Sequence, residues 1–148
     1  MARPDRRPDP SKHPHIQMLR EVRRAVFRLH KALIDAERAG LERQAGPVPS
    51  GVFLQSLLHD PELAWLRPFS GLIVEMDEAL AQPEPLSETD ARAFIDRVHN
   101  LVASADEPDD SGSSSRYGNA SRKDPDVLLA HVELMSRITD AGAEPGDP

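Results

Sequence analysis

Apolar residues recur every three or four positions along most of this chain, the spacing of helices that bury one face. The longest such stripe predicts one helix from about His15 to Gln44. Its members are Leu19, Val22, Val26, Leu29, Leu33, Ala36 and Gly40. A second apolar row lies beside it, formed by Ile16, Phe27, Ile34 and Leu41. A face this wide predicts that the helix contacts more than one neighbour.

Helix-start signals divide the rest of the chain. A serine or aspartate before a helix can accept bonds from its free N–H groups, and proline suits the first helical position. Such starts occur at Ser50, Asp60-Pro61, Ser87 and Asp124-Pro125. The first predicts an extra short helix near residues 50–58. The last predicts a helix whose buried face contains Leu128, Val132, Met135 and Ile138.

The helix that begins at Asp60 carries a proline inside its apolar stripe. The stripe consists of Leu63, Leu66, Phe69, Ile73, Met76 and Leu80. Pro68 lacks the N–H that would bond to the carbonyl of Ala64, so we expect a kink in this second main helix at Pro68.

Other segments lack apolar periodicity. Residues 105–123, ADEPDDSGSSSRYGNASRK, are rich in Ser, Gly and Asp and predict a mobile linker. Residues 1–13 and 142–148 predict disordered tails. With no strand pattern in between, the sequence predicts an all-α protein. We expect a four-helix-bundle-like single domain over residues 14–141.

Composition restricts the chemistry. The chain has 148 residues, enough for one domain, and no cysteine, which excludes disulfides, thiol nucleophiles and cysteine-based zinc sites. The first residues, MARPDRRPDP, lack the apolar core of a signal peptide. No apolar run approaches the roughly 20 residues that a membrane span needs. We therefore expect a cytoplasmic protein that does not bind a membrane.

Four segments resemble those of a known family. They are LHKALIDAER (Leu29–Arg38), GPV (Gly46–Val48), FLQSLLHDP (Phe53–Pro61) and WLRPFSGLIVEMDEAL (Trp65–Leu80). Together they resemble a family of short, uncharacterised bacterial helical proteins with no known activity. The resemblance covers about residues 14–80, and DPDVLLAH (Asp124–His131) is similar to the family's last helix. It implies a small helical fold and transfers no functional residue.

Motifs for common enzyme chemistry are missing from the sequence. It has no G-x-G-x-x-G segment, no Walker loop and no G-x-S-x-G elbow. The neighbouring carboxylates Glu75 and Glu78 point away from the apolar stripe, which is typical of a solvated helix surface. The sequence therefore favours a non-enzymatic protein without a cofactor.

A metal site in the bundle core is an alternative function. Inward histidines and carboxylates can bind metals there, and four such residues lie on or beside apolar faces: His30, Glu37, Asp77 and His131. Gathered together, they would suit zinc or iron. A di-iron site needs two Glu-x-x-His pairs, whereas this chain offers only Asp96-x-x-His99. Pairing of each group with protein partners is therefore favoured.

Charge is distributed unevenly. The net charge is −7, with 11 Lys/Arg against 6 Asp/Glu in residues 1–50. Arg20, Arg24, Arg28 and Lys31 form a basic stripe opposite the apolar face of the first helix. Such a stripe can contact nucleic-acid phosphates. The overall acidity favours instead a solvated face, or one paired with acidic helices.

The second apolar row of the first helix provides the main functional hypothesis. Phe27, Ile34 and Leu41 could form an interface with a second copy or another protein, or other helices of the same chain could cover them. Both interpretations remain open at this stage. The sequence thus predicts a protein that acts through protein–protein association, most simply as a homodimer.

Overall fold

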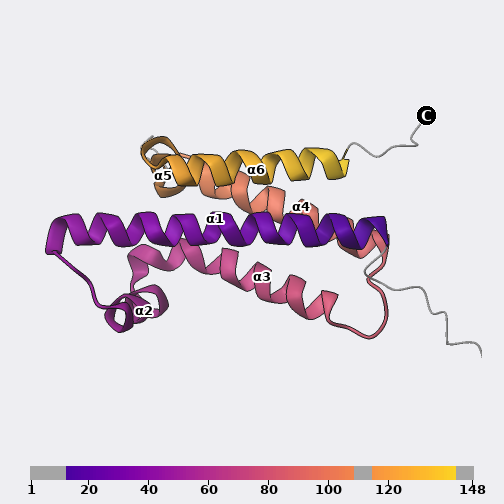
Figure 1. Cartoon of the computed structure of the whole chain (residues 1–148), viewed down its shortest axis with the longest axis horizontal. Coiled ribbons are helices and arrows are strands. Elements are labelled where there is room, and N and C mark those ends of the chain that lie inside the picture. The colour runs from indigo at the N-terminus through magenta and orange to yellow at the C-terminus, as the bar shows by residue number, and fades with distance from the viewer. Residues whose placement is uncertain (1–12, 109–114, 143–148) are drawn as a thin grey trace, which may run out of the picture.

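The computed structural model describes residues 13–108 and 115–142. These ranges contain α-helices, one 3-10 helix and no strand, so the all-α prediction is confirmed (Figure 1). The helices are α1 (Pro14–Ala45), α2 (Ser50–His59), the 3-10 helix η2 (Pro61–Leu66), α3 (Arg67–Leu80), α4 (Glu88–Asp106), α5 (Arg116–Lys123) and α6 (Pro125–Gly142). Apart from His13 and Gly142, the predicted tails lie outside the described residues.

The long helix α1 is central to the bundle. It packs against α4 and α6 on one side and α3 on the other, and it also contacts α5 and η2 (Figure 1). Two ion pairs, Arg28–Glu133 and Arg137–Glu21, join α1 and α6 in opposite chain order, so these two helices run antiparallel. No helix in the described ranges is long and apolar enough to cross a membrane.

The predicted stripe of α1 forms the centre of the core. Leu19, Val22, Val26, Leu29 and Leu33 are all buried. One apolar cluster joins them to buried residues from each of the other helices. Burying a leucine or valine side chain contributes about 1.5–3 kcal/mol, so this shared cluster is the main source of stability.

Three of the predicted helix starts are confirmed. In each, a side-chain oxygen accepts a hydrogen bond from a backbone N–H in the first turn, which satisfies one of the donors that a helix leaves unpaired. The bonds run from Glu62 N–H to Asp60 Oδ1 (2.9 Å), from Asp90 N–H to Ser87 Oγ (3.1 Å) and from Asp126 N–H to Asp124 Oδ1 (2.9 Å).

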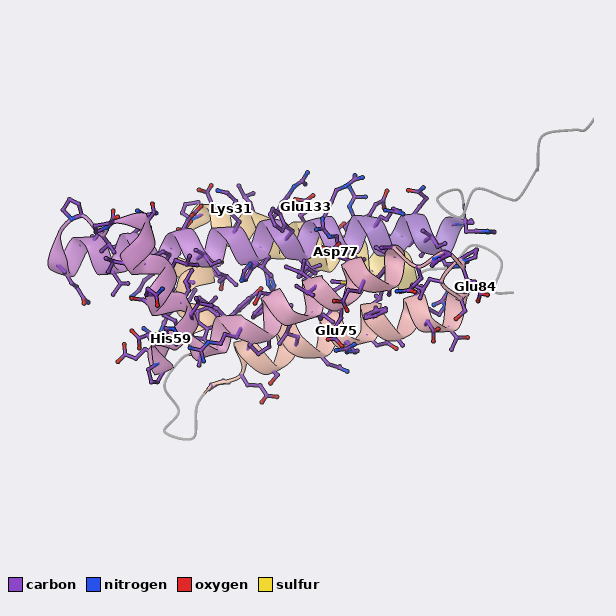
Figure 2. All side chains as sticks on the ribbon, turned by 90° about the horizontal axis from the view of Figure 1, so that it is seen from below. Lys31, His59, Glu75, Asp77, Glu84 and Glu133 are labelled. Carbon is purple, nitrogen blue, oxygen red and sulfur yellow. The ribbon has the colours of Figure 1, made fainter. Side chains whose placement is uncertain are left out.

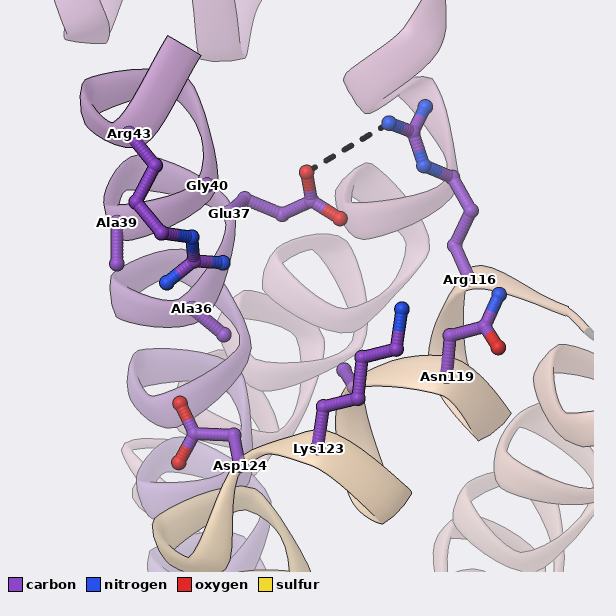
Figure 3. Close-up of a pocket in the computed structure, with 10 residues that line it drawn as sticks. Ala36, Glu37, Ala39, Gly40, Arg43, Arg116, Asn119, Lys123 and Asp124 are labelled. Atoms are coloured by element: carbon purple, nitrogen blue, oxygen red, sulfur yellow. Dashed lines mark ion pairs between the residues drawn. The ribbon is translucent and has the colours of Figure 1, made fainter. Parts of the chain in front are cut away.

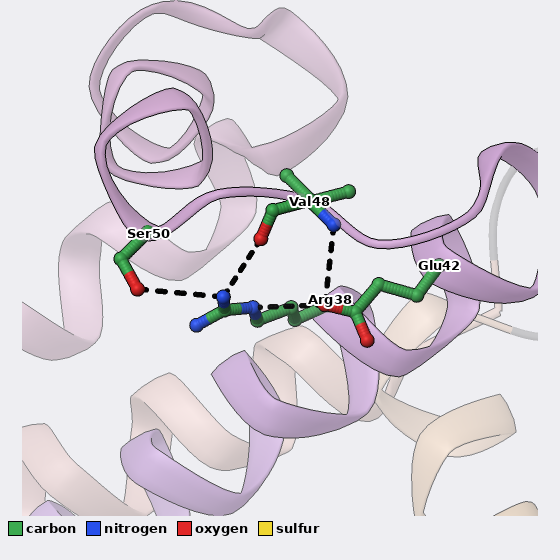
Figure 4. Close-up of polar contacts among 4 residues, drawn as sticks. All are labelled: Arg38, Glu42, Val48 and Ser50. Carbon is green, nitrogen blue, oxygen red and sulfur yellow. Dashed lines mark hydrogen bonds and ion pairs between the residues drawn. The ribbon is translucent and has the colours of Figure 1, made fainter.

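Arg38, rather than a cap at Ser50, fixes the start of α2 (Figure 4). Its guanidinium donates to the carbonyl of Val48 (2.7 Å) and the hydroxyl of Ser50 (3.4 Å), and its Nε donates to Glu42 (3.2 Å). The same guanidinium lies 5.6 Å from the ring centre of Phe53, the buried residue of α2. The capping role predicted for Ser50 was therefore wrong, because Pro49 precedes the helix and Ser50 lies inside it.

Pro68 begins a helix instead of kinking one. It lies in the first turn of α3, where a missing N–H costs nothing. The carbonyl of Ala64 is not left unpaired, because the N–H of Arg67 bonds to it in the tighter pattern of a 3-10 helix. The predicted second main helix is thus a 3-10 helix followed directly by an α-helix, and the change of helix type falls just before the proline.

The predicted 105–123 linker contains a helix. The helix α4 continues to Asp106, and residues 116–123 form α5; residues 109–114 lie outside the described ranges. The hydroxyl of Ser115 caps α5 by accepting from the N–H of Gly118 at 2.9 Å. The linker prediction was therefore wrong for residues 116–123, because tertiary packing stabilises a segment with weak helical preference.

Tyr117 supplies that packing. Its side chain is fully buried, and its ring stacks on that of Phe69 with 6.2 Å between the ring centres. Its hydroxyl is hydrogen-bonded to Nδ1 of His131 on α6 at 2.6 Å. A single residue thus joins α5 to both α3 and α6.

Two substitutions of Tyr117 should destabilise the protein to different extents. Tyr117→Phe keeps the ring and loses the hydroxyl's bond, so the free energy of unfolding should fall by about 1 kcal/mol. Tyr117→Ala also leaves a cavity and should lower it by about 3–5 kcal/mol, as for other buried aromatic residues. Urea denaturation followed by circular dichroism measures both. Equal losses in the two variants would contradict this assignment.

Candidate functional site

Three of the four residues predicted for a metal site have separate partners. Asp77 is exposed on α3 and forms a two-point ion pair with Arg23, at 2.7 and 3.0 Å. His131 is bound to the tyrosine of α5, and Glu37 faces Arg116. Within residues 13–108 and 115–142, no three His, Asp or Glu side chains form a group that could hold a metal ion. The structure therefore does not bring together the four residues of the alternative metal site, because periodicity identifies a helix face but not its neighbour.

His30 remains half-buried on α1. Burial lowers its pKa below the ordinary value of 6.5, because the charged imidazolium loses solvation. The folded protein therefore binds this proton less tightly than the unfolded chain does. The stability that neutral His30 contributes is complete above pH 6.5 and declines as the pH falls from there toward the lowered pKa.

Replacing His30 should reduce the sensitivity of folding to acid. Between about pH 7.5 and about pH 5.5, the free energy of unfolding should fall less for His30→Gln than for the unmodified protein. Urea denaturation at both pH values measures the difference. His99→Gln is the control, because His99 is exposed on α4 and its replacement should leave the decline unchanged. An identical decline in all three proteins would argue against a role for His30.

The predicted basic stripe is interrupted by ion pairs. Arg28 pairs with Glu133 on α6, and Lys31 pairs with Asp35 one turn along α1, at 3.0 Å. The other two arginines line a polar hollow of about 480 Å³ with Arg23, Asp77 and the end of α3. Nε of Arg20 is buried there, without a hydrogen-bond partner among the described residues. Half of the stripe is thus occupied by carboxylates of the same chain.

The three residues predicted for an interface differ in their exposure. Ile34 and Leu41 are partly buried and pack against the core, so coverage within the chain, the alternative left open above, accounts for them. Phe27 remains 49% exposed, with the guanidinium of Arg23 lying 5.6 Å from its ring centre. Only Phe27 keeps the exposure that the interface hypothesis required.

A larger apolar surface, missed from the sequence, lies on α6. Leu128, Leu129 and Val132 are 49%, 68% and 56% exposed, and we refer to these three residues as the α6 face. The buried residues of α6 are Val127, Ala130, Leu134 and Ala141. The predicted face was therefore wrong at Leu128 and Val132, although Met135 and Ile138 do pack against the core.

A charged groove runs beside the α6 face, between α1 and α6. Its volume is about 330 Å³, and Leu129 contributes to its lining. Arg28 and Lys31 lie on the α1 wall, while Asp126 and Glu133 lie on the α6 wall. Figure 2 shows Lys31 and Glu133 at the same edge of the bundle. The α1 wall also contains the carboxylate Asp35, so it carries one net positive charge, whereas the α6 wall is acidic.

A second cleft of about 230 Å³ separates the C-terminal half of α1 from α5 (Figure 3). Glu37 points into it, and its side chain is only 17% exposed. Burial raises the pKa of this carboxyl; nearby Arg116 lowers it in part, and Glu62 raises it further. Sequence analysis identified Glu37 as semi-buried but could not find Arg116, which lay in the predicted linker.

No protein-family model, curated protein or solved structure matches this chain. The family resemblance noted from the sequence therefore stays a prediction.

Proposed function

We propose that this protein is a cytoplasmic, non-enzymatic association module that forms a homodimer through the α6 face and the charged groove beside it. The observation that carries this proposal is the combination of three exposed apolar side chains with a groove whose two walls have opposite charge. Each feature alone is common on protein surfaces. Together they support a self-complementary interface.

The apolar side chains of the α6 face provide the driving force for dimerisation. Single exposed leucines are ordinary, but Leu128, Leu129 and Val132 are adjacent on one side of a single helix. Covering each such side chain with a partner contributes up to about 1.5–3 kcal/mol. In a two-fold dimer the three residues are covered in both copies, which doubles the contribution.

The charges of the groove between α1 and α6 favour a second copy of this chain as the partner over an unrelated protein. A two-fold interface brings the same patch of both subunits together, so the patch must complement itself. The α1 wall carries Arg28 and Lys31 with one carboxylate, Asp35, and the α6 wall carries Asp126 and Glu133. The pairs Arg28–Glu133 and Lys31–Asp35 within one chain are exposed, so a second copy can exchange partners with them. With two-fold symmetry, the basic wall of each copy faces the acidic wall of the other. Such exposed pairs set orientation more than affinity.

The other exposed apolar residues offer less support. On α2, Val52, Leu54 and Leu58 are exposed to a similar degree, but among its ten residues only His59 can carry charge. That surface has no pair of oppositely charged walls to select an identical copy. The α6 face is therefore the better candidate for self-association.

Leu129→Asp should break the dimer. The substitution places a charge at the most exposed apolar position and occurs twice in a two-fold interface, so a loss of about 2 kcal/mol per site weakens dimerisation by on the order of 1,000-fold. Sedimentation equilibrium measures the change. Leu54→Asp is a matched control, because Leu54 is 54% exposed on α2 and lies outside the proposed interface. An unmodified protein that stays monomeric at about 100 µM, or a dimer that only Leu54→Asp disrupts, would refute the proposal.

A charge reversal tests the orientation of the dimer. Lys31→Glu should weaken dimerisation by about fivefold to tenfold, since each exposed pair contributes less than about 1 kcal/mol and occurs twice. Adding Asp126→Lys to the same chain should restore the affinity, because the two walls then exchange signs at these positions. Sedimentation at low and high salt measures both effects. Additive weakening in the double variant would contradict the two-fold arrangement.

A further inference from the structure

We infer that the cleft between α1 and α5 binds a small anion through a carboxylate or phosphate group. This site is separate from the α6 face, and the inference does not depend on dimerisation. Its support comes from the placement of donors, the balance of charge and the shape of the cleft (Figure 3).

The helix α5 presents polar side chains to the cleft from one side. Arg116, Asn119 and Lys123 are spaced by three and four residues, which places them on one helical face. Tyr117, buried between α3 and α6, fixes the position of that face. Arg43 of α1 lines the opposite wall. The donors are therefore carried by two helices, and packing in the core fixes the backbones of both.

Positive charge exceeds negative charge in the cleft. Its lining has three cations, Arg43, Arg116 and Lys123, and two carboxylates, Glu37 and Asp124. One oxygen of Asp124 accepts the first N–H groups of α6 and so serves as that helix's cap. The cleft therefore carries one net positive charge.

The cations are only loosely engaged by the protein. The carboxylates of Glu37 and Glu62 lie 3.7 and 3.8 Å from the Arg116 guanidinium, beyond hydrogen-bonding distance. Its one short bond runs from Nη1 to the carbonyl of Glu62, at 2.8 Å. Within the described part of the chain, neither the guanidinium of Arg43 nor the ammonium of Lys123 forms a hydrogen bond or an ion pair. An anion in the cleft would give these donors an acceptor, and bonds to charged groups are the stronger ones.

Short side chains keep the cleft open. Ala36, Gly40 and Ala120 contribute to its lining. A Cβ atom built on Gly40 would meet only the end of Arg43, at 3.7 Å, so there is free space above this residue. The volume of about 230 Å³ is below the range of about 300–1,000 Å³ that is typical for drug-sized ligands. The cleft therefore fits a small oxyanion rather than a nucleotide.

Titration of the full-length protein with inorganic phosphate and, separately, with succinate tests the inference. Calorimetry at low salt should show saturable binding of at least one of them, and the anion that binds more tightly identifies the phosphate or carboxylate source. Arg43→Gln and Lys123→Gln should each weaken binding by about tenfold, the loss expected for one hydrogen bond to a charged group. Neither side chain holds other parts of the described structure, so both variants should keep the unmodified melting temperature.

Two further variants separate a real site from general electrostatic attraction. Glu37→Gln removes a negative charge from the cleft and should tighten anion binding by at least about threefold, opposite in sign to the lysine variant. Arg97→Gln is the matched control, because Arg97 pairs with Glu75 between α3 and α4 and should leave binding unchanged. Absence of saturable binding of both anions up to about 10 mM would overturn the inference. Equal weakening by Arg97→Gln and Lys123→Gln would also overturn it.

Discussion

The structure depends on covering the apolar stripe of α1. This helix has 32 residues and is therefore about 48 Å long, whereas α3, α4 and α6 have 14, 19 and 18 residues. None of the three can cover α1 from end to end. Beside its C-terminal half, the short helix α5 supplies part of the cover (Figure 1). The α1–α5 cleft thus lies where a long helix is packed by a short one.

Features determined by neighbouring residues could be predicted from the sequence. Asp60, Ser87 and Asp124 each accept a bond from an N–H two or three residues later, so the sequence alone contains the whole interaction. Features that depend on competing hydrogen-bond patterns, or on contacts between residues distant in sequence, could not be predicted. The change of helix type before Pro68 is a choice between two hydrogen-bond patterns of similar geometry. The helix α5 forms because Tyr117 is buried by helices distant in sequence.

The α6 face and the α1–α5 cleft also depend on contacts that the local sequence does not determine. At the start of α6 the sequence VLLAHV is apolar on nearly all sides, so periodicity could not decide which residues face the core. Contacts with α1, α4 and α5 decide it, burying Val127, Ala130 and Leu134 and leaving the α6 face exposed. The helical pattern placed Glu37 correctly as a semi-buried carboxylate. Its partner Arg116 lies 79 residues further along the chain, and no local pattern connects the two.

The antiparallel pairing of α1 with α6 has a consequence for how the protein folds during synthesis. The ribosome makes α1 before α6, its most extensive partner, and about 80 residues separate the two helices. During that interval the stripe of α1 has α3 and α4 as partners but not α6. Contacts between such distant segments slow folding, because a long loop must close before they form. The nascent chain therefore exposes apolar surface to aggregation and to chaperones until residues 125–142 emerge.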